Sequence, residues 1–436
     1  MMLRLLVFCL LFLLPVRVLA APADLPSRCF VCAAASEAAY SGELPELLRA
    51  RLAAAGWQIA SYETEGRRGT VGRFFHMVRT DEDGTETHLI AFPGTERGSD
   101  VWTDLRLGRA AFGGDSPAEF LAVRDMRVTE RREMPLVHRG FLDYTQAALF
   151  TDVLPVYGNR TAGEVLAAEL RAYPSMRIYL TGHSLGGAAA VLTAARLSDL
   201  GVAPEQLVVT TFGAPAVGNA AFVRRYEGRF TLHRVVMSGD PMKDVLAAPL
   251  GFQQFGERVP WSPARSVAKF PHAMMVYVDA AIRQLYDAYG GDNAFLFLMG
   301  LPNRTEGRTL YALPIETELD DTLAEDAPYM MAVLRDALHV QNASVVFAAG
   351  GGGLSADGLL SGLSSHLAAA RAAGAEQMVA YRIAGVKIRD ARETYRLTLE
   401  RVVYDRDGNL LAATSRSART GTLTPIETVL YLFAQD

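Results

Sequence analysis

The chain has 436 residues, of which 50% are hydrophobic and 21% are charged, and its formal net charge is −5. This length exceeds one typical domain, and the composition is that of a folded globular protein and excludes a disordered chain. An acidic balance without a long basic run argues against a nucleic-acid binder, because contact with phosphates needs clustered lysine and arginine. We therefore expect one large domain with an appendage, or two domains.

The first 20 residues are typical of a signal peptide. Arg4 supplies a positive charge, residues 5–14 form an unbroken apolar stretch, and Val18 and Ala20 are small residues near a cleavage position. The apolar stretch is too short to span a bilayer comfortably, so a retained anchor is the weaker alternative. We expect cleavage after Ala20 and a secreted or periplasmic mature protein.

Two of the three cysteines would remain after cleavage, since Cys9 lies in the signal peptide. Cys29 and Cys32 form a Cys-x-x-Cys pair, which in an oxidising compartment favours a small disulfide. A thioredoxin-like redox role would need a strand before the pair and a helix that opens at it. Pro26 lies just before the pair and an alanine-rich stretch follows it, so this role is the less favoured alternative.

Residues 74–237 alternate between strand and helix patterns. Residues 74–95 contain two β-rich runs around Asp83-Gly84, the pattern of a hairpin. Helices are expected over residues 141–154, over residues 163–173 and from the glycine turn after 181 to Leu200. Further strands are expected over residues 176–181, 207–212 and 232–237. This alternation predicts an α/β fold with a mainly parallel sheet covered on both faces, over residues 21–289.

The character of the chain changes after Tyr289. Residues 290–293 (Gly-Gly-Asp-Asn) are a plausible boundary, and residues 350–353 form a short glycine run. Residues 381–414 alternate polar and apolar side chains around the turn at 405–409, which predicts a hairpin or small sheet. Residues 290–436 are therefore either a small α+β domain or an extension of the first sheet.

The segment Gly182-His183-Ser184-Leu185-Gly186 lies between a predicted strand and a predicted helix. A Gly-x-Ser-x-Gly turn in this context holds the serine in a strained conformation with its hydroxyl exposed, and the glycines prevent clashes. The helix N-terminus favours negative charge that develops nearby. A mere glycine-rich turn is the alternative, but the small residues at 187–190 suit close packing of helix and strand. We take Ser184 as a candidate nucleophile.

A serine nucleophile needs a histidine base and a carboxylate that orients the base. In α/β-hydrolases both partners follow the serine, with the acid first. Asp240 comes directly after the strand predicted at 232–237, and His272 follows that acid. We therefore expect Asp240 to be the acid and His272 the base.

Each assignment has an alternative. Asp240 could cap a turn with Pro241, Asp244 is a rival for the acid, and His272 could be an exposed loop residue. The other downstream histidines fit the role of base less well: His233 precedes the acid inside a strand, and His339 and His366 belong to the C-terminal region.

The negative charge of an acyl-transfer intermediate needs two backbone N–H groups aimed at it. One is expected from Leu185, the residue after the nucleophile, and the other from a loop after an early strand. Gly94-Thr95 fits the second position, and Thr95 could add its hydroxyl. An ordinary Pro-Gly turn is the alternative.

Four blocks of the chain together resemble the class 3 lipase family, the fungal-type triacylglycerol lipases and their bacterial relatives. Their order and spacing make the combination more specific than any single block, and the resemblance runs from the predicted hairpin to His272. The blocks are LIAFPGT at 89–95, VHRGF at 137–141, TGHSLGGA at 181–188 and TFGAPAVGN at 211–219.

This resemblance implies an α/β-hydrolase fold, with Ser184, Asp240 and His272 as the triad. It also implies Thr95 and Leu185 as oxyanion donors and a lid over residues 99–105 that contains Trp102 and Asp104; a buried tryptophan is an equal alternative for Trp102. The implied substrate is a lipid or small ester, with transient contact to a lipid surface and no metal or organic cofactor. Phospholipid hydrolysis, another α/β-hydrolase activity, and a catalytically silent lipid-binding protein are the alternatives.

The chain departs from the family pattern at two positions outside the triad. Pro93 stands where many members carry a basic residue, and Ala216 replaces an arginine that is common after the Gly-x-Pro turn. Both departures weaken any transfer of substrate preference from the family.

Overall fold

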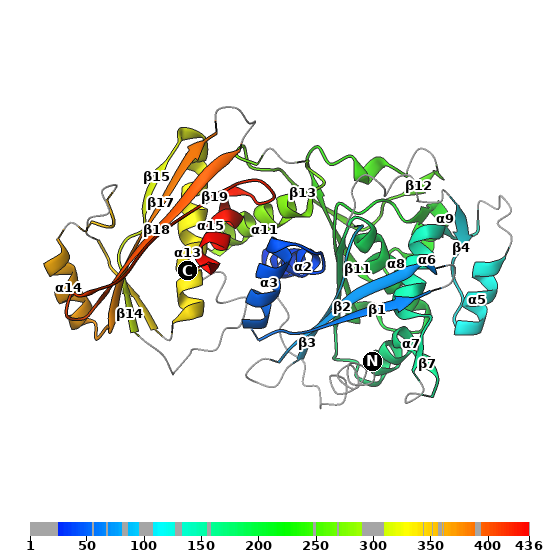
Figure 1. Cartoon of the computed structure of the whole chain (residues 1–436). Helices are drawn as coiled ribbons and strands as arrows, with labels where there is room; N and C mark the ends of the chain where they lie inside the picture. The colour runs from blue at the N-terminus through cyan, green and yellow to red at the C-terminus, as the bar shows by residue number, and fades with distance from the viewer. Residues whose placement is uncertain are drawn as a thin grey trace. The chain divides into compact units, whose positions relative to one another are not determined.

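The computed structural model comprises two compact units (Figure 1). Unit 1 contains Met1–Ser262 and Pro271–Val278, and unit 2 contains Pro263–Phe270 and Asp279–Asp436. The predicted boundary at 290–293 lies outside the described residues, as does the signal peptide predicted over 1–20. The structure describes residues 25–54, 56–66, 69–80, 86–95, 108–126, 133–154, 158–246, 250–267, 270–289, 309–342, 344–350, 352–355, 360, 362–388 and 394–435.

The central sheet of unit 1 has seven strands within the described ranges, in the order β1-β2-β3-β8-β9-β11-β13. The first three pair antiparallel, and the pairs from β3 to β13 are all parallel. The mainly parallel α/β sheet and the antiparallel pairing of the predicted hairpin are thereby confirmed. The strands are β1 (Gln58–Glu65), β2 (Val71–Thr80), β3 (Glu86–Phe92), β8 (Ile178–His183), β9 (Leu207–Phe212), β11 (Thr231–Met237) and β13 (Glu257–Trp261).

Helices cover both faces of this sheet. All six residues of β8 are buried, and so are all six of β9, which is typical of parallel strands between two helical layers. Helices α2 and α8 both pack against β8, and Figure 1 shows them on opposite sides of the sheet. The helices are α2 (Leu25–Ala38), α3 (Glu43–Ala54), α5 (Pro117–Asp125), α6 (Arg139–Leu149), α7 (Ala162–Ala172), α8 (Leu185–Asp199) and α9 (Ala220–Tyr226).

Polar side chains start several of these helices. His138 accepts the N–H of Phe141 at 3.3 Å and so caps α6, while Thr161 and Glu164 form a capping box at α7. The VHRGF block thus supplies a helix start.

A smaller sheet of unit 1 joins two of the four sequence blocks. Its order is β12-β10-β5-β4, and Gly218 of β10 pairs with Val137 of β5. Asn219 caps α9 through Phe222 and also accepts the N–H of Leu136 at 3.0 Å. The strands are β4 (Arg109–Ala111), β5 (Leu136–His138), β10 (Gly218–Asn219) and β12 (Phe252–Gln253), and a separate pair is formed by β6 (Val153–Leu154) and β7 (Arg160–Thr161).

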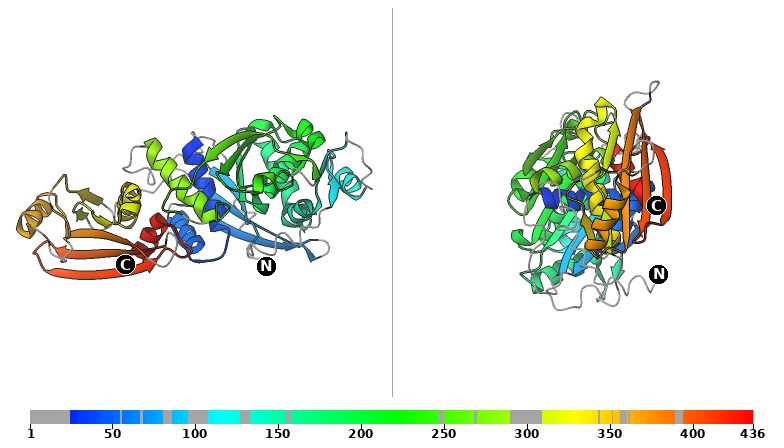
Figure 2. Two further views of the ribbon diagram at one scale, coloured as in Figure 1. Left: turned by 90° about the horizontal axis from the view of Figure 1, so that it is seen from above. Right: turned by 90° about the vertical axis from the view of Figure 1, so that its left-hand side faces the viewer.

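Unit 2 is an α+β unit around a mixed sheet of six strands in its described part. The long strands β17, β18 and β19 lie side by side and antiparallel (Figure 2). Asp405 accepts the N–H groups of Asp407 and Asn409, so the predicted turn at 405–409 joins β18 and β19 as a hairpin. The elements are β14 (Thr309–Ala312), β15 (Glu316–Leu319), β16 (Ser344–Phe347), β17 (Gln377–Lys387), β18 (Tyr395–Asp405), β19 (Leu410–Arg419), α13 (Ala327–Gln341), α14 (Leu363–Ala372) and α15 (Pro425–Ala434).

Helix α11 (Met274–Tyr289) contributes residues to both units, because unit 2 resumes at Asp279. In unit 2, Arg283 bonds Asp279 at 2.6 Å and Asp326 at 2.5 Å, a buried network that holds this half of the helix. Across the described residues no helix is long and apolar enough to cross a membrane.

The predicted disulfide between Cys29 and Cys32 is wrong: the structure holds both as buried thiols inside α2. Pro26 lies in the first turn of this helix, so both cysteines belong to one helical segment. Residues three apart on a helix have Cβ atoms about 5–6 Å apart, whereas a disulfide needs about 3.8 Å. Burial also raises the pKa of the Cys32 thiol to about 11, which disfavours the thiolate that redox chemistry requires.

Candidate active site

Ser184 lies on the turn between β8 and α8. Its backbone angles are φ 55° and ψ −122°, a strained conformation for a residue with a side chain. The Ser184 N–H donates to the carbonyl of Phe212 on the neighbouring strand β9 at 3.0 Å. This strand-turn-helix geometry is that of a nucleophile elbow.

The glycines of the motif are needed because backbones approach each other closely here. A Cβ atom at Gly182 would lie 2.3 Å from the carbonyl carbon of Gly186, and one at Gly186 would lie 2.0 Å from the carbonyl oxygen of Phe92. Both obstacles are backbone atoms, so they cannot move aside as a flexible side chain would.

Gly186→Ala is therefore expected to destabilise unit 1 by about 1–3 kcal/mol, the usual cost of overpacking. Urea unfolding followed by tryptophan fluorescence measures this effect, because all three tryptophans of the chain fall within the range of unit 1. Gly108→Ala is the matched control, since among the described residues its added methyl group would meet nothing closer than 3.5 Å. Equal stability of the two variants would contradict the close approach.

Ser184, His272 and Asp240 form one hydrogen-bonded chain. His272 Nε2 lies 3.0 Å from Ser184 Oγ, and His272 Nδ1 lies 2.9 Å from Asp240 Oδ2. A carboxylate only accepts, so Nδ1 carries the hydrogen, and Nε2 is left to accept the serine proton. This is the arrangement that activates a serine hydroxyl.

Asp240 is buried and held by further donors. Its Oδ1 accepts the N–H of Met242 at 2.8 Å, and its Oδ2 accepts the hydroxyl of Tyr277 at 2.5 Å. Burial alone would raise the pKa of Asp240, but the hydrogen bond and charge of His272 and the other two donors outweigh it, so the pKa lies below its ordinary value. The carboxylate therefore stays ionised beside the imidazole.

The two expected oxyanion donors lie on segments that meet at this turn. Leu185 is the first residue of α8, and the Pro93–Gly94 segment after β3 approaches the same turn. A Cβ atom at Gly94 would lie 2.8 Å from the carbonyl oxygen of His183. Thr95, which follows Gly94, is exposed.

The alternative partners lie elsewhere. His233 pairs with Glu257 at 3.2 Å between strands β11 and β13. Asp244 belongs to a short 3-10 helix (Met242–Asp244) after the acid, and His339 and His366 belong to unit 2. Trp102 and Asp104 of the expected lid lie outside the described residues.

Sequence reasoning missed Tyr277 as a partner of Asp240. It lies in the apolar start of α11, five positions after His272, and nothing in that pattern separates it from a core tyrosine. Its burial and the neighbouring carboxylate raise its pKa, so the hydroxyl remains a donor.

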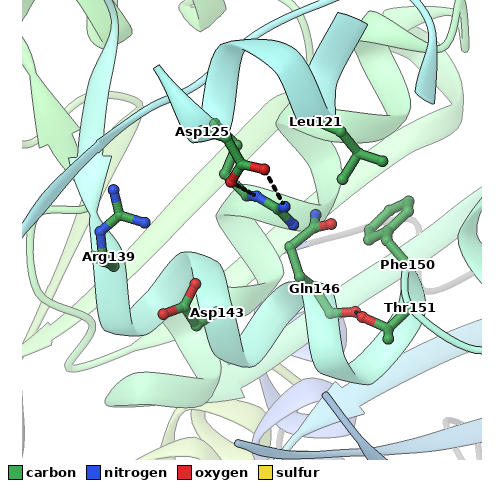
Figure 3. Close-up of a pocket in the computed structure, with 8 residues that line it drawn as sticks. Leu121, Asp125, Arg139, Asp143, Gln146, Phe150 and Thr151 are labelled. Carbon is green, nitrogen blue, oxygen red and sulfur yellow. Dashed lines mark hydrogen bonds and ion pairs between the residues drawn. The ribbon is translucent and has the colours of Figure 1, made fainter. Parts of the chain in front are cut away.

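A cavity of about 550 Å³ lies between α5 and α6, apart from the triad (Figure 3). Figure 3 shows Arg139, Asp143 and Gln146 reaching it from α6, opposite Leu121 and Asp125 of α5. None of the triad residues lines it. No group of three His, Cys, Asp or Glu side chains suited to a metal is found in the described part of the chain.

Buried histidines make the stability of unit 1 depend on pH. Burial lowers the pKa of His76 well below 6.5, that of His138 to about 4 and that of His183 to about 3. Below pH 6.5 these histidines bind protons in the unfolded chain but stay neutral in the folded one. The free energy of unfolding should therefore fall as the pH drops from 6.5 towards 4. Burial raises the pKa of Glu37 to about 7, so this group opposes the trend: between 4.5 and 7 the folded state binds its proton.

Urea unfolding by tryptophan fluorescence at about pH 7, 5.5 and 4.5 should therefore show falling midpoints. Glu37→Gln should steepen the fall, because it removes the one opposing group named above. A midpoint that rises on acidification would contradict this assignment.

The site has the geometry of an α/β-hydrolase. A parallel sheet carries a serine on a strand-to-helix turn, and this serine is hydrogen-bonded to a histidine, which is hydrogen-bonded to a carboxylate. Residues 89–248 match the family model described as Lipase (class 3). This segment is therefore similar to the class 3 lipase family, as the sequence blocks predicted.

Several known proteins are similar to part of this chain. A Caenorhabditis elegans protein, Lipase ZK262.3, is 33% identical over 145 residues, which is 31% of this chain and 38% of the relative. The Rhizomucor miehei lipase is 34% identical over 127 residues, 28% of this chain and 31% of the relative. The toxin TseL of Vibrio cholerae is 36% identical over 91 residues, 21% of this chain and 12% of the toxin. This chain thus spans less than two thirds of the length of these relatives.

Solved lipase structures align with more of the chain. Lipase II from Rhizopus niveus covers 55% of this chain, with 82% of its own length aligned, 22% sequence identity and a TM-score of 0.39. The Rhizomucor miehei triacylglyceride lipase covers 55% of this chain, with 81% of its own length aligned, 21% identity and a TM-score of 0.38.

Proposed function

We propose that this protein is a serine carboxylic-ester hydrolase that acts on lipid esters, with Ser184, His272 and Asp240 as its triad. The observation that carries the proposal is the hydrogen-bonded chain from Ser184 Oγ through His272 to Asp240, with distances of 3.0 and 2.9 Å. The match of residues 89–248 to the family model described as Lipase (class 3) supports an ester as the substrate class.

The reaction proceeds by acyl transfer to the serine. His272 Nε2 takes the proton as Ser184 Oγ bonds to the ester carbonyl carbon, and Asp240 balances the resulting imidazolium. His272 then protonates the departing alcohol, which leaves an acyl-serine. Water then hydrolyses the acyl-serine by the same steps. His272 takes a proton from the water as its oxygen bonds to the acyl carbon. His272 returns this proton to Ser184 Oγ as the carboxylic acid departs.

We propose that the backbone N–H groups of Thr95 and Leu185 stabilise the oxyanion of both tetrahedral intermediates. The approach of Gly94 to His183 and the place of Leu185 at the start of α8 support this assignment. Preorganised donors of this kind commonly supply a factor of about 10²–10³ in rate each.

A lipid-ester substrate and secretion are inferred from relatives. A Gibberella zeae protein with the name Secreted mono- and diacylglycerol lipase 2 is 46% identical to this chain over 61 residues. Together with the apolar stretch at 5–14 and the small residues at 18 and 20, this supports export with cleavage after Ala20. Because Pro93 and Ala216 depart from the family pattern, the preferred acyl group and headgroup of the substrate are to be determined by measurement.

A substrate panel tests the proposal. The full-length mature protein should hydrolyse p-nitrophenyl esters and triglyceride or phospholipid emulsions, and it should leave a peptide amide intact. Ser184→Ala should abolish each activity, while Ser198→Ala, which removes a hydroxyl bonded to the Ala195 carbonyl of α8, should retain it. Absence of ester hydrolysis by folded protein would contradict the function.

A further inference from the structure

The residue before the nucleophile, His183, links three segments of unit 1. Its Nε2 atom lies 2.7 Å from the backbone carbonyl oxygen of His272. Its Nδ1 atom lies 2.7 Å from the hydroxyl oxygen of Tyr40, which follows helix α2. A continuous chain of hydrogen bonds therefore runs from Tyr40 through His183 to the backbone of His272.

The chemistry of the partners fixes the direction of these bonds. A carbonyl oxygen only accepts, so His183 must carry its hydrogen on Nε2. Burial, and next the charge of His272, lowers the pKa of His183 to about 3, so the ring is neutral and its Nδ1 atom has a lone pair. Nδ1 therefore accepts the hydrogen of the Tyr40 hydroxyl, which holds the ring in the tautomer that donates to His272.

Tyr40 also lies against the loop that carries Thr95. A Cβ atom at Gly94 would lie 2.0 Å from the Tyr40 hydroxyl oxygen. The same hydroxyl thus touches the expected oxyanion loop and supports the histidine behind the base.

Tyr40 is itself held in place from two sides. Arg49 of α3 donates to the backbone carbonyl of Tyr40 at 2.9 Å and to that of Ala38 at 2.6 Å. On α2, Ser36 Oγ lies 3.0 Å from the hydroxyl of Thr181, two residues before His183 on β8. The end of α2 is therefore fixed to the strand that leads into the nucleophile turn.

Packing alone does not explain why position 183 carries a histidine. Its ring lies near that of His272, with centroids 4.5 Å apart, and an apolar side chain could fill that space. Instead, both ring nitrogens are in hydrogen bonds of 2.7 Å, and one of these bonds reaches the residue whose imidazole must face Ser184.

We propose that Tyr40 and His183 are positioning residues, which hold the backbone of His272 so that its imidazole meets Ser184 Oγ. Helix α2 thereby contributes to the rate of acyl transfer as well as to folding. The inference rests on the proposed function, because it concerns the base of that reaction.

The test compares His183→Ala with His183→Gln in the full-length protein. The amide nitrogen of glutamine can replace the Nε2–H donor, whereas alanine cannot. His183→Ala is expected to lower kcat on a soluble p-nitrophenyl ester by about 10- to 100-fold, since small misplacements of a base are this costly. KM should stay within about two-fold, and His183→Gln should recover most of kcat.

A fluorophosphonate probe separates positioning from folding. The final extent of Ser184 labelling measures the fraction of folded sites, and the labelling rate measures their reactivity. Full extent with a slow rate is expected for His183→Ala; a wild-type rate, or an equal loss in His183→Gln, would overturn the proposal. If wild-type protein is not labelled at all, the proposed function fails instead.

Tyr40→Phe keeps the proposal testable should His183→Ala not fold, because it removes a single oxygen atom. The loss of one hydrogen bond predicts a labelling rate roughly 3- to 10-fold lower at full extent. Tyr226→Phe is the matched control: it deletes a hydroxyl bonded to Asp199 at 2.7 Å, and its labelling rate should equal that of the wild type. Equal rates for Tyr40→Phe and Tyr226→Phe would overturn the role of Tyr40.

Discussion

His272→Ala is expected to lower kcat for ester hydrolysis by roughly 10⁴- to 10⁶-fold, with folding intact. The imidazole is the group within hydrogen-bond distance of Ser184 Oγ, at 3.0 Å. Without it, the serine hydroxyl at its ordinary pKa is a poor nucleophile, and the leaving alcohol has no acid to protonate it. Steady-state hydrolysis of a p-nitrophenyl ester at saturating concentration measures the effect.

His233→Ala is the matched control for this loss. His233 is also a largely buried histidine with a carboxylate partner, Glu257 at 3.2 Å, but it lies between strands β11 and β13 and does not contact the serine. Its removal should leave kcat within a few-fold of the wild type. If His233→Ala abolished activity and His272→Ala did not, the base would have to be reassigned.

Asp240→Asn is expected to reduce kcat by about 10⁴-fold. An ionised carboxylate accepts the Nδ1–H of His272, which leaves Nε2 free to accept the serine proton. An amide nitrogen can donate to Nδ1 instead, and the ring hydrogen then moves to Nε2, where it blocks proton transfer from Ser184. The variant should fold, because the amide oxygen can still accept the N–H of Met242, and the second N–H of the amide nitrogen can donate to the Tyr277 hydroxyl oxygen.

The rival acid provides the control for this second prediction. Asp244→Asn changes a carboxylate only four positions away, in the 3-10 helix after Asp240, and should keep near-normal kcat. The pH profile adds a further readout: in Asp240→Asn, activity should recover partly at high pH, where hydroxide can take the serine proton directly. Loss of activity in Asp244→Asn with retention in Asp240→Asn would contradict the assignment.

Much of unit 1 was predictable because its signals are local. The strands that became β8, β9 and β11 are short apolar runs, and the glycines around Ser184 mark the tight turn directly. The loops after parallel strands gather at one edge of the sheet, which is why order along the chain was enough to select Asp240 and His272. The structure brings these residues within hydrogen-bond distance, and their catalytic roles stay predictions.

The parts that sequence reasoning missed depend on contacts between distant segments. Tyr40 and His183 are 143 positions apart, and neither residue type in its pattern indicates a hydrogen bond. The cysteine prediction rested on the spacing of the pair and an oxidising compartment, and it did not foresee that one helix, α2, contains both cysteines, with Pro26 in its first turn. The division of the chain at Asp279 also falls inside α11, where an unbroken helical pattern hides it.

The most direct measurement is covalent labelling of the mature protein with a fluorophosphonate, followed by peptide mapping. We expect one adduct per chain on Ser184, loss of the adduct in Ser184→Ala, and slow labelling in His272→Ala and Asp240→Asn. Folded protein that remains unlabelled, or an adduct on another serine, would contradict the assignment of Ser184 as the nucleophile.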